Sequence, residues 1–156
     1  MISGDAIVHL SLAGGVTRAG IPQRVSFERW VLAAATGVRR LGASEVSIRI
    51  VGSEEGREFN QRYRQRDYAT NVLSFPADLP PEMKLPLIGD LVICAPVIAS
   101  EAQTQGKPVR NHYAHMTVHG VLHLLGHDHQ TNDDAARMEA LETRILRTLG
   151  ITHPYG

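Results

Sequence analysis

This chain of 156 residues contains a single cysteine, Cys94. A lone thiol cannot close an internal disulfide, which excludes the small secreted scaffolds that depend on such bonds. The first residues also lack the basic and apolar regions of a secretory signal. We therefore expect a protein of a reducing compartment, the cytoplasm.

Long apolar runs are missing as well. The longest, from Leu91 to Ala99, is interrupted by Pro96 and falls far short of the about 20 residues that cross a bilayer, so no membrane partner is expected. Excess charge is also absent, because 16 Lys and Arg residues balance 16 Asp and Glu residues. Without a global field that would attract a polyanion, any nucleic-acid site must be local.

The hydrophobic content of 43% is that of a compact globular protein, and we expect one domain over residues 1–156. Periodicity predicts strands over residues 6–12, 45–51, 71–75 and 88–94, and helices over residues 27–41, 53–64, 96–105, about 108–125 and about 132–149. This order predicts the α+β fold class, with a layered, α/β-like arrangement. In it, a small mixed β-sheet of about four strands packs with about five helices, one of which carries histidines as in zincins.

Local signals set the expected helix ends. Ser26 is a good N-cap and Gly42 a good stop for the first helix, and Thr131 with Asp134 resembles a capping box for the last. The acidic residues of the last helix are expected on its solvated face; they are Asp133, Asp134, Glu139 and Glu142.

Histidine is concentrated in one segment, since six of the 8 histidines fall in the stretch from His112 to His129. His115, His119 and His123 recur every four residues and share one helix face. One ion cannot bind all three, because His115 and His123 are separated by about 12 Å of helix rise, whereas nitrogens on one tetrahedral ion lie about 3.4 Å apart. A third ligand must come from another segment.

Gly126 supplies the turn that this ligand needs. A glycine in the left-handed region would end the helix and return His127 or His129 toward the pair His119 and His123. The string from His119 to His129 has the H-x-x-x-H-x-x-G-x-x-H spacing of metzincin zinc sites. We predict one divalent metal ion, most simply Zn²⁺, with His129 selected by the spacing and His127 as an alternative ligand.

The general base of the metalloproteases is missing, because Gly120 stands where their glutamate would be. This loss disfavours a peptidase but leaves the metal site, where three imidazoles keep a coordination position open for hydrolytic chemistry. A local basic segment contains Arg57, Arg62, Arg64 and Arg66. Arginine matches phosphate geometry well, although such a cluster is also typical of a solvated helix face.

Several separated motifs together resemble the YbeY family, the bacterial endoribonucleases also called rRNA maturation factors. They are Tyr63-Arg64, the segment from Thr70 to Pro76, the segment from Gly89 to Ile93, the string from His119 to His129, the segment from Glu139 to Glu142, and Pro154-Tyr155. The motifs occur in family order, and position 120 carries the glycine of the family in place of the protease glutamate.

This resemblance implies a metal-dependent endoribonuclease, specific for single-stranded RNA, that acts in 16S rRNA 3′-end maturation and ribosome quality control. It implies the 16S rRNA precursor, the small ribosomal subunit and assembly factors such as a ribosome-associated GTPase as partners. Residue by residue, it implies zinc on His119, His123 and His129. Arg64 would be the catalytic or RNA-backbone-binding arginine.

Further residues are candidates for contact with ligand imidazoles or with RNA; they are Asp128, His127, His115, Asn71 and Ser74. Each also has an ordinary structural interpretation, such as shaping a turn or bonding a strand end. Two other functions remain open from the sequence. One is a metal-dependent hydrolase of another substrate, including peptides, and the other is a non-catalytic ribosome-assembly factor with a structural metal.

Overall fold

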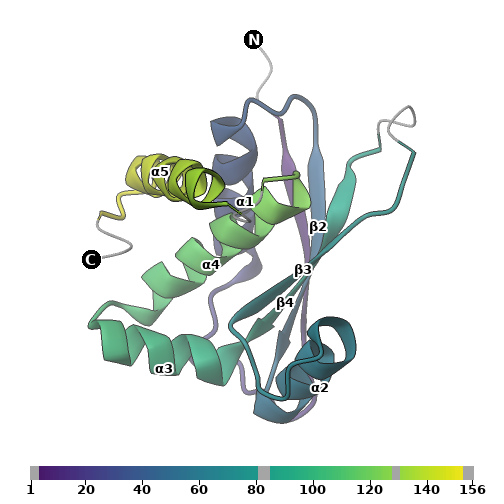
Figure 1. Cartoon of the computed structure of the whole chain (residues 1–156), viewed down its shortest axis with the longest axis vertical. Coiled ribbons are helices and arrows are strands. Elements are labelled where there is room, and N and C mark those ends of the chain that lie inside the picture. Colours follow the sequence, from purple (N-terminus) through teal and green to yellow (C-terminus); the bar gives the residue numbers. More distant parts are fainter. Residues whose placement is uncertain (1–3, 81–84, 128–130, 153–156) are drawn as a thin grey trace.

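A mixed sheet of four strands organises the computed structural model, which describes residues 4–80, 85–127 and 131–152 (Figure 1). In chain order, the elements are β1 (Ala6–Leu12), α1 (Arg24–Gly37), β2 (Ser44–Val51), α2 (Ser53–Arg64), β3 (Val72–Pro76), β4 (Leu87–Cys94), α3 (Ala95–Gln105), α4 (Val109–Leu124) and α5 (Asn132–Thr148). The predicted α+β fold class is confirmed. No helix in this described part of the chain is long and apolar enough to span a membrane.

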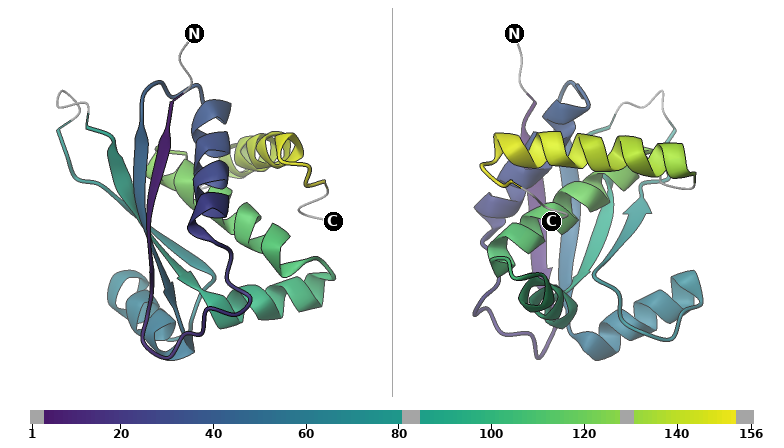
Figure 2. Two further views of the ribbon diagram at one scale, coloured as in Figure 1. Left: turned by 180° about the vertical axis from the view of Figure 1, so that it is seen from behind. Right: turned by 60° about the vertical axis from the view of Figure 1, so that its left-hand side comes forward.

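The strand order is β1-β2-β4-β3, in which β1, β2 and β4 run parallel and β3 runs antiparallel to β4. Alternation along β2 sends Val46, Ile48 and Ile50 into the main core beneath the helices α1, α4 and α5. The opposite face of the sheet buries Val92 and Cys94 with Phe59 of α2. Figure 2 shows this division, with α2 on one side of the sheet and α1, α4 and α5 on the other.

The end of α4 is formed by Gly126, as the sequence predicts. This residue has a φ of 95°, and its N–H donates to the carbonyl of His123 over 3.0 Å. The N–H of His127 then donates to the carbonyl of Leu122 over 2.9 Å. These two bonds are the pair that closes a helix through a left-handed glycine.

The predicted ends of α1 are wrong. The N-cap is Gln23, and Ser26 is buried inside the first turn, where its N–H already donates to the carbonyl of Gln23 over 2.9 Å. At the other end, Arg39 adopts a φ of 60°, and the next N–H, that of Arg40, bonds the carbonyl of Ala35. A non-glycine residue in the left-handed conformation therefore stops the helix before Gly42 is reached.

The predicted cap of α5 is confirmed. The hydroxyl oxygen of Thr131 accepts a hydrogen bond from the backbone N–H of Asp134 over 3.0 Å. This contact fixes the start of α5. The helix covers α1 and α4, and one of its carboxylates contacts the histidines described below.

Candidate metal centre

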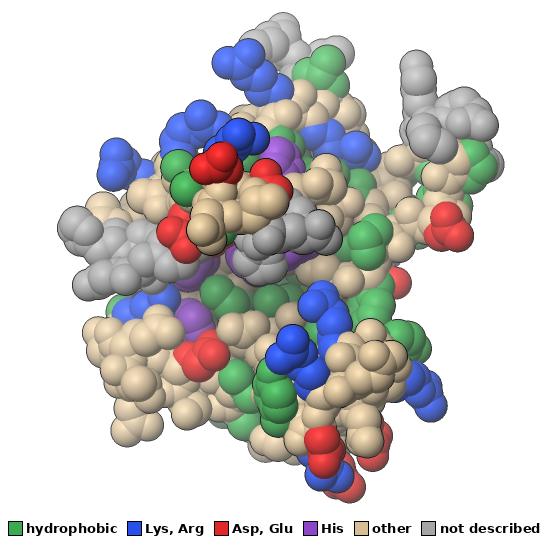
Figure 3. Space-filling model, viewed as in Figure 1, with side chains coloured by type: hydrophobic (Ala, Val, Ile, Leu, Met, Phe, Trp, Pro, Cys, Tyr) green, Lys and Arg blue, Asp and Glu red, His purple; other side chains and the backbone are tan. Residues whose placement is uncertain are grey.

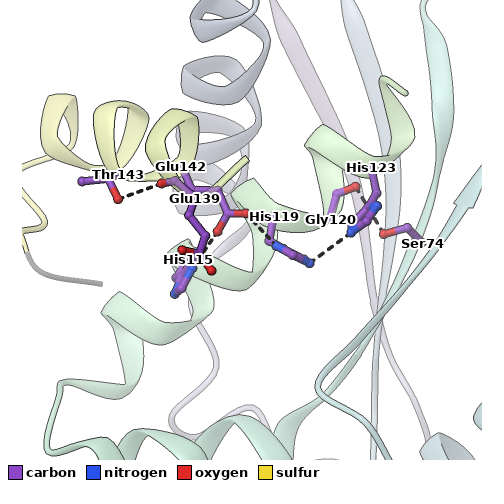
Figure 4. A network of polar contacts seen from close by, with 8 residues as sticks. All are labelled: Ser74, His115, His119, Gly120, His123, Glu139, Glu142 and Thr143. Atoms are coloured by element: carbon purple, nitrogen blue, oxygen red, sulfur yellow. Dashed lines mark hydrogen bonds and ion pairs between the residues drawn. The ribbon is translucent and has the colours of Figure 1, made fainter. Parts of the chain in front are cut away.

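Two of the predicted metal ligands converge on one face of α4. The Nε2 atoms of His119 and His123 lie 3.1 Å apart (Figure 4). Two nitrogens that bind one tetrahedral ion are about 3.4 Å apart, so the separation of this pair is close to that of two ligands on one ion. A spacing of four residues on a helix therefore brings two imidazole nitrogens to about the separation that one metal ion requires.

The third predicted ligand, His129, and its neighbour Asp128 lie outside the described residues. The described His, Cys, Asp and Glu side chains contain no group of three that could hold a metal ion. His127 is described and is exposed on the turn after α4. It thus does not complete a three-residue group with His119 and His123 among the described residues.

A carboxylate on α5 orients the first ligand. Glu142 Oε2 accepts a hydrogen bond from Nδ1 of His119 over 2.8 Å, and Oε1 accepts one from Nε2 of His115, also over 2.8 Å. With its proton on Nδ1, His119 presents the lone pair of Nε2 toward His123. A carboxylate that holds the non-ligating nitrogen of a histidine is the usual support of a metal-binding imidazole.

The prediction that Glu142 lies on a solvated face is wrong. Its side chain is 1% exposed, although Asp133 and Glu139 on the same helix are exposed. Glu142 follows Met138 by four residues and precedes Ile145 by three, and both of these are buried in the core. This spacing placed Glu142 on the apolar stripe and was the signal that the sequence analysis missed.

His115 is buried rather than exposed to a groove. Its side chain is 5% exposed, and it contacts the same carboxylate as His119. The structure therefore places it behind the candidate ligands, on the side away from solvent, where it helps to hold Glu142 in place.

Close packing against the sheet explains Gly120. A Cβ atom at this position would lie 2.8 Å from Cδ2 of Leu91 and 3.3 Å from Oγ of Ser74. The hydroxyl of Ser74 also donates to the carbonyl of Gly120 over 3.2 Å. The predicted RNA-contact residue Ser74 thus ties β3 to α4, and the site has no room for a protease-like glutamate at position 120.

Asn71 has a comparable structural role at the start of β3. Its side-chain amide donates to Oε1 of Glu101 over 3.0 Å, and its Oδ1 accepts from the N–H of Val72 over 2.7 Å. The same carboxylate bonds Nε2 of the buried His112 over 2.7 Å. Burial lowers the pKa of this histidine, against the opposing effect of the Glu101 hydrogen bond.

Arg64 is the last residue of α2 and is exposed. It makes no hydrogen bond or ion pair with another described residue, whereas Arg57 of the same helix lies 3.3 Å from Asp67. Figure 3 shows basic side chains over α2 and histidines over α4 on one face of the molecule. A basic group is therefore presented to solvent on the same face as the candidate metal centre.

Comparison with known proteins identifies the family of this chain. The model of the family described as "Endoribonuclease YbeY" matches residues 22–150, and the chain belongs to this family. The resemblance found in the sequence motifs is confirmed.

Relatives named Endoribonuclease YbeY match most of the chain. The one from Stenotrophomonas maltophilia strain R551-3 is 52% identical over 99% of this chain and 98% of its own length. The one from Cellvibrio japonicus is 54% identical over 86% of this chain and 76% of its own length. The solution structure of TM1509 from Thermotoga maritima covers 96% of this chain and 99% of its own, with a TM-score of 0.56 and 18% identity, and supports the fold.

Proposed function

We propose that this protein is a metal-dependent endoribonuclease that cleaves single-stranded RNA. The observation that carries the proposal is the 3.1 Å separation of the His119 and His123 Nε2 atoms, in a chain whose relatives are named endoribonucleases. In this proposal residues 1–156 act as one cytoplasmic catalytic domain. The biological substrate is the 16S rRNA precursor, whose 3′ end is matured as part of ribosome quality control, and the partners are the small ribosomal subunit and an associated assembly GTPase.

The proposed ligands of the ion are His119, His123 and His129. A bound divalent ion, which we take to be Zn²⁺, would supply positive charge to polarise a phosphodiester oxygen and acidify water. The chain contributes the geometry for this ion, because Glu142 fixes the ring of His119 from the rear. Buried packing around Glu142 then keeps both the carboxylate and the ring in one orientation.

Arg64 is proposed as the residue that stabilises negative charge on the phosphate. A guanidinium can donate two parallel hydrogen bonds to phosphate oxygens. In the structure its side chain is exposed and is not engaged by another described residue, so no internal contact must break before it binds RNA.

The packing of Gly120 disfavours the peptidase alternative. The general base of the helical zinc proteases would occupy this position, yet a Cβ here already meets Leu91 and Ser74. A phosphodiester substrate suits the site better, because the arginine can stabilise negative charge on the phosphate oxygens and no carboxylate base is required at position 120.

The test is cleavage of a single-stranded 16S rRNA 3′ precursor by purified protein. We expect the wild type to cut this RNA and to leave a duplexed version intact, and we expect Arg64→Ala and His123→Ala each to lose about 100-fold or more of the rate. Arg24→Ala is the matched control, because Arg24 is exposed on α1 and paired with Glu28 over 2.8 Å. Equal cleavage by all four proteins would overturn the proposal and indicate a contaminating nuclease.

A further inference from the structure

Tyr63 of α2 packs against two aromatic rings although half of it faces solvent. The side chain is 51% exposed. Its ring stacks on Phe59, with centroids 6.1 Å apart, and meets Phe75 of β3 edge-on at 4.9 Å. Its hydroxyl makes no hydrogen bond with another described residue. The ring is therefore fixed in place by two aromatic neighbours while a large part of its surface is left uncovered.

The position of Phe75 connects this ring to the candidate metal centre. Consecutive residues of a strand point to opposite faces of a sheet. Ser74 contacts Gly120 of α4 on one face, and Phe75 contacts Tyr63 on the other. The strand that carries both, β3, is the last in the sheet order, so its outer edge is unpaired among the described strands. Only the width of this edge strand separates the two surfaces.

The charge around Tyr63 favours a polyanion. Its sequence neighbours Arg62 and Arg64 are both exposed in the last turn of α2. Proteins that bind single-stranded nucleic acid combine basic side chains for the backbone with aromatic rings on which bases stack. The same segment of this chain offers both elements.

We propose that Tyr63 is a base-stacking residue that holds one unpaired base of the RNA while the strand passes over the edge of β3 toward the histidines. This inference rests on the proposed function and adds a reason for single-strand preference. A base can lie flat on the ring only when it is not stacked inside a duplex. Phe59 and Phe75 brace the ring, so little side-chain freedom is lost when the base binds.

Binding of a fluorescent single-stranded RNA to the metal-loaded protein tests the proposal, with single abasic sites placed in turn along the RNA. Stacking of one base is worth about 1–3 kcal/mol, so Tyr63→Ala and Tyr63→Leu should each weaken binding by roughly 5- to 150-fold. Tyr63→Phe should bind within about twofold of wild type, because the face of the ring is what contacts the base. Tyr63→Leu retains an apolar contact with Phe75, which separates loss of stacking from loss of folding.

The matched control is Tyr68→Ala. Tyr68 is equally exposed, at 52%, and its hydroxyl accepts a hydrogen bond from Arg66 over 3.2 Å, but it has no ring contact with another described residue. We expect this variant to bind within about twofold of wild type, since no aromatic neighbours among the described residues hold the Tyr68 ring in place for a base.

The abasic series identifies the contact without a folding argument. We expect one abasic position to weaken binding to wild type as much as Tyr63→Leu does, and to cause no further loss in that variant. If the wild type cleaves RNA but Tyr63→Leu binds RNA as tightly as the wild type does, the stacking role is overturned and the proposed function stands. The same conclusion follows if Tyr63→Ala and Tyr68→Ala lose equal amounts of RNA affinity. Absence of any RNA cleavage by wild type would instead overturn the proposed function itself.

Discussion

The carboxylate of Glu142 lies 2.8 Å from Nδ1 of His119, and this contact joins the last helix of the fold to the candidate metal centre. The same carboxylate bonds His115, so two turns of α4 are held by one residue of α5. The position of a metal ligand on α4 thus depends on the packing of α5. Both helices belong to one hydrophobic core, which buries Met138 and Ile145 on either side of Glu142.

Replacing this carboxylate should weaken the metal site. We expect Glu142→Gln to lower zinc affinity by about 10- to 100-fold, because an amide holds the His119 ring less strongly than a carboxylate does. The measurement is a competition titration against a chelator of known affinity. Glu139→Gln, on the exposed face of the same helix, should keep wild-type affinity. Equal affinities in all three proteins would mean that Glu142 serves packing alone.

Gly120 should tolerate no side chain. We expect Gly120→Ala to lower the free energy of unfolding by about 1–3 kcal/mol, since the added methyl group must displace the buried Leu91 side chain. Gly14→Ala provides the control, because a Cβ at Gly14 meets nothing within 4 Å. Urea unfolding of the metal-free proteins gives both values. Similar stability for Gly120→Ala and wild type would show that α4 can move away from the sheet at no cost.

Glu142 and Gly120 show which features of this site can be predicted from the sequence and which cannot. Spacing alone indicates the pair His119 and His123, since helix geometry is local. It does not indicate that Glu142 turns toward them, because the contact between α4 and α5 depends on how two helices cross in the core. In the same way, the motif places a glycine at position 120, but only the packed sheet explains it.

The helix ends show the same limit. The capping residues of α5 are local side-chain chemistry and were predicted correctly. The C-terminal end of α1 was not, because Arg39 takes a left-handed conformation that its side chain does not favour. At the N-terminal end, the helix begins before Ser26, with Gln23 as its N-cap. The strand order β1-β2-β4-β3 is likewise a long-range property, which the alternation within each strand does not encode.

His112 should make stability depend on pH. Burial lowers its pKa below the ordinary value of 6.5, so the unfolded chain binds this proton more readily than the native one. The contribution of neutral His112 to the free energy of unfolding is fully present above pH 6.5. It is lost as the pH falls toward the lowered pKa, and the free energy of unfolding then changes by at most about 1.4 kcal/mol per pH unit.

The comparison that isolates this effect is urea unfolding of wild type and His112→Gln at pH 7.5 and pH 5.5, values chosen about one unit to either side of the ordinary pKa of histidine. The free energy of unfolding of wild type should fall more between these conditions than that of the variant. Contributions from groups that the two proteins share cancel in the difference. An equal fall in both would mean that the Glu101 hydrogen bond offsets the burial of His112.

The most direct test of the proposed metal centre is the metal content of four proteins after equilibration with limiting zinc. Wild type should bind one ion per chain, and His123→Ala and His129→Ala should lose it, because His129 completes the predicted motif. His127→Ala should keep the ion, because the described His127 side chain forms no three-residue group with His119 and His123. Retention of zinc by His129→Ala together with its loss from His127→Ala would contradict the assignment. Failure of wild type to bind any divalent ion would contradict the metal centre as a whole.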